Sequence, residues 1–113
     1  MLPLASLPLD EVAELIEGRR EVLIPKKRFD VFTNPNTAAM VDALDPDEVI
    51  VFGVATDVCD HAAIVGLLDR GRRVAFVEDA ARGLSAERVA ACTAVWRDRG
   101  VRFTSTDEVV RAA

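Results

Sequence analysis

The apolar run Val49–Val54 constrains the fold of this chain more than any other feature of its sequence. A continuous apolar run of this length is typical of a strand that a parallel sheet buries on both faces. Small and polar residues follow it and lead to Cys59 and then to His61, which is the only histidine of the chain. We therefore expect a central strand, a tight turn and a helix over about Val58–Arg70, with Cys59 close to the start of that helix.

Strands and helices are expected to alternate from Glu21 onward. The first residues, with two prolines, are expected to form a loop before a short helix capped by Asp10. The alternation predicts an α/β fold of parallel strands joined by helical crossovers. The expected strands cover residues 21–25, 49–54, 73–79 and 101–105, and the expected helices cover residues 10–16, 34–44, 58–70 and 85–99, with a last helical turn over 107–113. Within 85–99, Cys92 and Trp96 share a face that should pack on the sheet.

Composition excludes several classes of function. The chain has 113 residues, which suggests one domain, and half of them are hydrophobic. Its net charge is -5 and no basic stripe is present, so nucleic acid is not an expected partner. It has neither an apolar run of about 18 residues nor a signal peptide at Met1, so we expect a cytoplasmic protein without membrane contact. There the two cysteines should be thiols, and their spacing does not fit zinc.

The position of Cys59 suits a nucleophile. Ligands of parallel sheets bind beyond the carboxyl ends of the strands, where Cys59 should lie. In the first turn of a helix, the N–H groups favour a thiolate and can also stabilise an oxyanion. Small residues at Gly53 and Ala55 would let a substrate approach the backbone. The alternative is an inert, buried cysteine, with Thr56 and Asp57 merely capping the helix. His61 should point away from Cys59 and be partly exposed.

A basic segment, Lys26–Arg28, follows the expected strand at 21–25 and so belongs to the same edge of the sheet. A lysine there would favour the thiolate of Cys59 through its charge. On composition alone, a solvated basic loop is the preferred interpretation of this segment.

Several motifs in the same order resemble the isochorismatase-like cysteine hydrolases, a superfamily that includes the nicotinamidases. The resemblance covers the chain from about Glu21 to its end and leaves residues 1–20 as a leader with a short helix. It implies a three-layer α/β/α sandwich around a parallel sheet, similar to a Rossmann fold. The motifs that carry it are KKRFDVFTNPN, GVATDVC followed by AA, and VAFVEDAARGL.

The resemblance implies an amidohydrolase that works without a cofactor. Cys59 would be the nucleophile that attacks the carbonyl of a small amide, releases ammonia or an amine, and forms a thioester that water hydrolyses. Lys26 would be the family lysine, because it stands six residues before Phe32, and Lys27 is the alternative register. The presence of the cysteine favours C–N hydrolysis over the cleavage of isochorismate.

The resemblance also implies how the substrate would be held. The peptide bond between Val54 and Ala55 would be cis, as in the family, and would turn the Ala55 N–H toward the oxyanion. The Cys59 N–H would be the second donor. Phe32 and Val54 would lie next to the substrate.

The sequence departs from the family in its N-terminal part. The family strand that ends in the third catalytic residue, an aspartate, has no counterpart here, and Asp10 does not match it. The metal ligands of the nicotinamidases belong to the same part of the family fold. Asp60 stands where the family has an apolar residue. We expect a fragment or a shortened gene model of a longer hydrolase. The alternatives are a degenerate member that needs a partner, and a second chain that supplies the strand, as in a homo-oligomer.

Two other functions stay open. The first is a non-catalytic interaction module, which would explain why the catalytic aspartate of the family is absent. A nucleotide-binding α/β domain is disfavoured, because no glycine-rich phosphate motif follows any expected strand.

Overall fold

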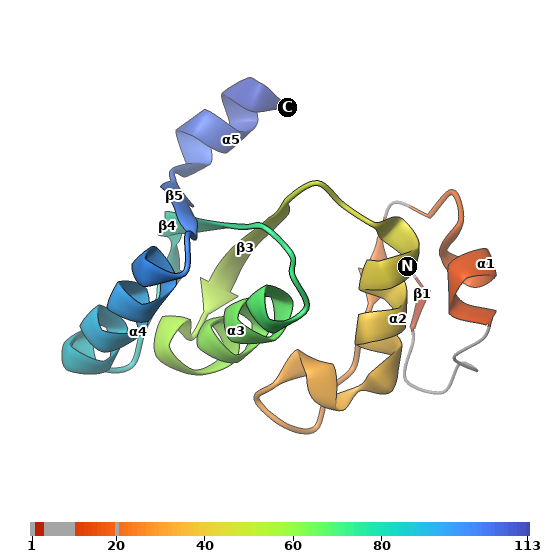
Figure 1. Ribbon diagram of the computed structural model, residues 1–113, viewed down its shortest axis with the longest axis horizontal. Helices are drawn as coiled ribbons and strands as arrows, with labels where there is room; N and C mark the ends of the chain where they lie inside the picture. Colours follow the sequence, from red (N-terminus) through yellow and green to blue (C-terminus); the bar gives the residue numbers. More distant parts are fainter. Residues whose placement is uncertain (1, 4–10, 20) are drawn as a thin grey trace. The chain divides into compact units, whose positions relative to one another are not determined.

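The computed structural model describes residues 2–3, 11–19 and 21–113. It consists of two compact units, Met1–Pro46 and Asp47–Ala113. Each unit has its own sheet and its own helices (Figure 1). None of the helices in the described ranges is both long enough and apolar enough to span a membrane.

The first unit holds a two-stranded parallel sheet and two helices. Strand β1 (Leu2–Pro3) pairs with β2 (Val22–Leu23), and α1 (Val12–Ile16) packs near α2 (Pro35–Leu44). The expectation of a loop at the N-terminus is wrong for residues 2–3, because a two-residue edge strand tolerates a proline that donates no hydrogen bond. The predicted cap Asp10 lies outside the described residues. A small core forms around Val12 and Ile16, both buried.

Helix α2 begins as its sequence predicts. The Asn34 side chain accepts a hydrogen bond from the Asn36 N–H over 3.0 Å, and Pro35 takes the first helical position. This is the cap that the Asn-Pro pair favours, because proline has no N–H to leave unpaired there. Before it, Val31–Thr33 form a 3₁₀ turn, η2, between the expected strand at 21–25 and the expected helix at 34–44.

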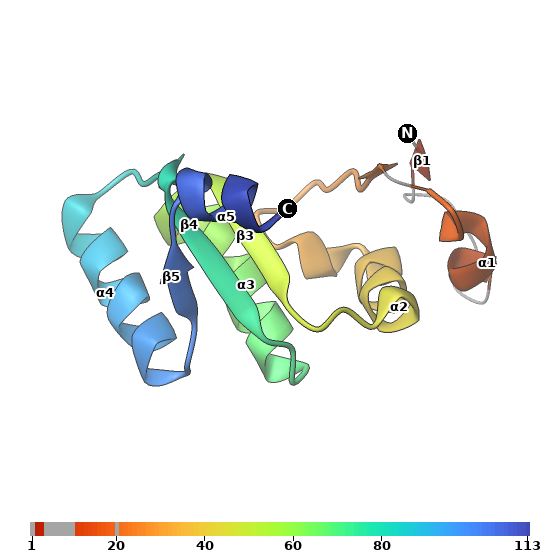
Figure 2. The same ribbon diagram turned by 90° about the horizontal axis from the view of Figure 1, so that it is seen from above.

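The second unit is a three-layer α/β/α arrangement. Strands β3 (Val49–Val54), β4 (Val74–Arg82) and β5 (Arg102–Thr104) form a parallel sheet in the order β3-β4-β5. Helices α3 (His61–Asp69) and α4 (Ala86–Asp98) lie on one face of this sheet, and α5 (Thr106–Ala112) lies on the other (Figure 2). The sheet and helices predicted for this half of the chain are confirmed, with ends that differ by a few residues.

Strand β3 differs from its prediction in position and in burial. It lies at one edge of the three-stranded sheet within the described residues, and not at the centre. Its side chains alternate, so that Phe52 is 65% and Val54 is 72% exposed, and the expectation of burial on both faces is wrong. The reason is that α5 contacts only part of this face, in a groove that includes Ile50 and Phe52. The hydrophobic pattern of a strand does not reveal whether helices cover both faces of its sheet completely.

The opposite face of the sheet is well packed by Trp96 of α4. This indole is fully buried and meets the Phe76 ring with its centroid 4.9 Å away, in an edge-to-face contact. The prediction that Trp96 packs on the sheet is confirmed. Ser85 caps α4 as expected by accepting a hydrogen bond from the Arg88 N–H, and Gly100 follows the helix with a positive φ of 85°.

Candidate active site

The turn after β3 places Cys59 one helical turn beyond the end of the strand. The peptide bond between Val54 and Ala55 is cis, as the resemblance implies. A π-helical turn, η3 (Thr56–Asp60), follows and runs directly into α3. The Ala55 carbonyl accepts hydrogen bonds from the N–H groups of Val58, over 3.1 Å, and of Asp60, over 3.0 Å. The helical turns therefore begin two residues earlier than predicted, and Cys59 lies in the first of them as a half-buried thiol that forms no disulfide.

Asp57 of this turn is tied to the start of α4. Its side chain is fully buried and accepts hydrogen bonds from the N–H groups of Leu84, over 2.9 Å, and Ser85, over 3.2 Å. The Arg88 Nε also donates to it over 3.0 Å. The Leu84 N–H, followed by the Arg88 guanidinium, holds the pKa of Asp57 below its usual value despite the burial of the carboxyl group. The alternative that Asp57 merely caps its own helix is wrong, because these three donors lie in a different segment.

The segment that meets Asp57 needs a glycine at position 83. A Cβ at Gly83 would overlap the side chain of Val89 and would lie 3.2 Å from Oδ1 of Asp57. The absence of a side chain at Gly83 therefore avoids an overlap with α4 and a tight contact with the turn.

Asp60 of the same turn is also buried. The residue is only 5% exposed, and its Oδ2 has no hydrogen-bond partner among the described residues. Burial raises the pKa of this carboxyl group. The carboxyl lies beside Gly53, where a Cβ would stand 3.7 Å from Oδ1. The structure thus buries a carboxyl group at the residue where the sequence departs from the family.

His61 has a structural partner. Its Nδ1 accepts a hydrogen bond from the Trp96 indole N–H over 2.9 Å, and the two rings stack with centroids 5.9 Å apart. His61 is half-buried, which confirms the expectation of a partly exposed helix residue. This hydrogen bond links the start of α3 to α4.

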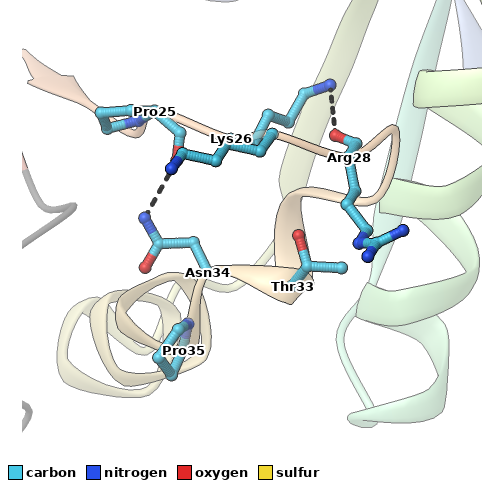
Figure 3. A pocket seen from close by; sticks show the side chains of 7 residues that line it. Pro25, Lys26, Arg28, Thr33, Asn34 and Pro35 are labelled. Carbon is cyan, nitrogen blue, oxygen red and sulfur yellow. Dashed lines mark hydrogen bonds between the residues drawn. The ribbon is translucent and has the colours of Figure 1, made fainter.

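Lys26 lies in the first unit, in the loop between β2 and η2. Its Nζ donates to the Arg28 carbonyl over 3.2 Å, while the Asn34 Nδ2 donates to the Pro25 carbonyl over 3.0 Å (Figure 3). These residues line an open hollow of about 360 Å³. Phe32 lies nearby in η2, where its N–H donates to the Asp30 carboxylate over 2.9 Å. The basic loop is therefore ordered around Asn34 by its own hydrogen bonds.

The predicted site residues divide between the two units. Val54, Ala55 and Cys59 come together in one turn of the second unit, while Lys26 and Phe32 belong to the first unit. The contacts of Asp57 and the burial of Asp60 were not predicted from the sequence. The partners of Asp57 are 27–31 residues away along the chain, and no local pattern marks such a contact. The burial of Asp60 could have been predicted, because the family has an apolar residue at this position.

The part of the chain that the structure describes contains no group of three or more histidine, cysteine, aspartate or glutamate side chains that could hold a metal ion.

Comparison with protein families gives one match of nearly full length. A model described as the isochorismatase domain matches residues 7–108. No curated protein matches this sequence.

Solved structures with the same fold are distant in sequence. The nicotinamidase/pyrazinamidase PncA of Bacillus subtilis is 16% identical with a TM-score of 0.69, and the match covers 83% of this chain and 52% of that protein. An isochorismatase-like hydrolase of Alkaliphilus metalliredigens is 17% identical with a TM-score of 0.69, covering 83% and 50%. YcaC of Escherichia coli, an octameric hydrolase of unknown specificity, is 18% identical with a TM-score of 0.67, covering 81% and 46%. The chain spans about half the length of these proteins.

Proposed function

This chain belongs to the isochorismatase domain family, and from that premise we propose that it is the part of a cysteine hydrolase that carries the nucleophile. The observation that supports the proposal most directly is the position of Cys59. The thiol forms no disulfide and is half-buried, and it lies in the first helical turn after the carboxyl end of a parallel strand. Backbone N–H groups at such a place can bind an oxyanion.

The proposed reaction is the hydrolysis of a C–N bond in a small amide. The sulfur of Cys59 attacks the carbonyl carbon, and the N–H groups of Ala55 and Cys59 bind the oxygen as it becomes negative. The C–N bond breaks, and the nitrogen leaves as ammonia or an amine after it takes up a proton. Water then hydrolyses the thioester, which releases a carboxylic acid and restores the thiol. Lys26 would favour the thiolate by its charge, and Phe32 and Val54 would contact the substrate.

The substrate class rests on two supports. The Bacillus subtilis protein is named as a nicotinamidase/pyrazinamidase, which makes an amide of a small aromatic acid a reasonable first substrate to test. The cysteine itself supports acyl transfer through a thioester. Nicotinamide and pyrazinamide are therefore the first compounds to offer this chain.

The proposal is tested by release of ammonia from these amides and by trapping of an acyl group on Cys59. The variant Cys59→Ala should lose both, while Cys92→Ala should retain both, because Cys92 lies on α4 and is not placed in the site. Iodoacetamide should label Cys59 before Cys92. Full activity of Cys59→Ala, or equal labelling of the two thiols, would contradict the proposal.

A second candidate is an interaction module without catalysis. The exposure of Phe52 and Val54 on an edge strand favours it, because apolar strand edges recruit partners. The Escherichia coli relative is octameric, so a homo-oligomer is the first assembly to test by light scattering. Observable acylation of Cys59 in the 113-residue chain would reject this candidate.

A further inference from the structure

Asp57 joins two segments that are far apart in the sequence. It stands two residues before Cys59, in the turn η3. Its carboxylate binds the N–H groups of Leu84 and Ser85, which lead into α4, and the Nε of Arg88 in the first turn of that helix. The three donor–acceptor distances are 2.9, 3.2 and 3.0 Å, so each is a well-formed hydrogen bond.

The chemistry of this contact requires a carboxylate. Three donors converge on one side chain, and a carboxylate offers only acceptors, on two oxygens. Two of the donors are backbone N–H groups just before a 13-residue helix, where the helix dipole favours negative charge. An asparagine would present its own N–H group to one of these donors. The side chain is fully buried, so water cannot replace a lost partner.

The neighbouring backbone is shaped to let this contact form. Gly83 leaves no Cβ between the segment and the turn, and a Cβ there would overlap Val89. Asp57 therefore binds the segment to the turn, and the absence of a side chain at Gly83 leaves room for this contact.

We propose that Asp57 is a positioning residue that fixes the backbone of the turn, so that the N–H groups of Ala55 and Cys59 face the carbonyl oxygen of the substrate. Asp57 touches neither the substrate nor the sulfur in this role, and it acts through the backbone alone. The inference deepens the proposed function and rests on it.

The expected effect follows from how sharply oxyanion binding depends on geometry. Loss of a single backbone or side-chain donor to an oxyanion typically slows acyl transfer by about 10²–10³-fold. Alkylation of a thiol by iodoacetamide needs an accessible thiolate but no oxyanion donor. The ratio of the acylation rate to the alkylation rate therefore reports positioning and is insensitive to exposure of the thiol.

The experiment measures both rates at Cys59 in the full chain by peptide mass spectrometry. The acylating probe is 4-nitrophenyl acetate: the sulfur attacks the ester carbonyl, 4-nitrophenolate leaves, and an acetyl thioester remains. In Asp57→Asn we expect the ratio to fall about tenfold or more. In Arg88→Ala, which removes one of three donors, we expect a smaller fall of about two- to threefold.

Asp69→Asn is the matched control. Asp69 ends α3 and pairs with Arg99 over 2.9 Å, so this variant also removes a carboxylate that contacts the α4 segment, but away from the turn. Its ratio should equal that of the wild type. Circular dichroism establishes that each variant folds.

The outcomes separate the two proposals. A wild-type chain that is not acylated at Cys59 would contradict the proposed function, and the role of Asp57 would be rejected with it. Acylation of the wild type with an unchanged ratio in a folded Asp57→Asn would overturn the role of Asp57 alone. If Asp57→Asn does not fold, Arg88→Ala decides, and an unchanged ratio there overturns the inference.

Discussion

The turn that carries Cys59 contains two aspartates, Asp57 and Asp60, whose pKa values are shifted in opposite directions. On the side that faces α4, Asp57 has three donors, and hydrogen bonds hold its pKa below the usual value. On the side that faces Gly53, Asp60 is buried with one oxygen unpartnered among the described residues, and burial raises its pKa. Identical side chains three residues apart thus differ in what the surrounding backbone offers them. Burial alone does not decide whether a charge is stabilising.

The two aspartates should make stability depend on pH with opposite signs. An unfolded aspartate has a pKa of about 3.9. The contribution of Asp57 is fully present above that pH and is lost as the pH falls through its lowered folded value. The contribution of Asp60 is fully present below that pH and is lost as the pH rises through its raised folded value. From this pair alone, the chain should be more stable in mild acid than at neutral pH.

The largest effect is expected from a substitution that disturbs the packing of the segment around Gly83, next to Asp57. Gly83→Ala puts a methyl group into Val89 and beside Oδ1 of Asp57. We expect a loss of about 1–3 kcal/mol in the free energy of unfolding, as for other overpacked sites. Urea unfolding followed by circular dichroism measures it.

The control for this substitution is another glycine with open surroundings. Gly18→Ala meets no atom within 4 Å but adds the backbone cost of a positive φ of 72°, which Gly83→Ala does not carry. A loss in Gly83→Ala as large as that in Gly18→Ala would therefore come from overlap. If Gly83→Ala were as stable as the wild type, the segment 83–85 would not be held against the turn, and the two sides of the turn would no longer differ as described.

Sequence reasoning was accurate where the cause of a structure is local. The caps at Asn34 and Ser85 follow from side chains that bind an N–H group two or three residues away. It was inaccurate for β3, since exposure of Phe52 depends on which helices cover the sheet. The hydrogen bonds of Asp57 could not be predicted either, because they join residues that only the fold brings together. The place of Cys59 after an apolar strand pointed to it before the family resemblance did, the cis peptide came from the resemblance alone, and no residue pattern indicated the role of Asp57.

A smaller effect is expected on the other side of the turn. Asp60→Asn keeps the shape of the side chain but removes the charge that burial disfavours. At neutral pH the variant should be more stable than the wild type by about 1 kcal/mol, because no charge is left without a partner. In acid the difference should shrink, since the wild-type carboxyl is then protonated.

Unfolding by urea at several pH values measures this effect, with the exposed Asp69→Asn as the control. A variant that is less stable than the wild type at neutral pH would show that Asp60 has a partner in solution, and the contrast with Asp57 would be lost.

The smallest expected effect is on the reactivity of Cys92, which lies on α4 and whose pKa is affected by the charge of Asp57. Burial first, and then the negative charge of Asp57, raise the pKa of the Cys92 thiol, while Arg88 partly opposes them. Asp57→Asn removes the negative charge and leaves Arg88 in place. Iodoacetamide should therefore label Cys92 about two- to fivefold faster in this variant at neutral pH, because more of the thiol is ionised. Arg88→Ala should slow the same labelling. Opposite changes in the two variants separate this electrostatic effect from a general loosening of α4, which would speed labelling in both.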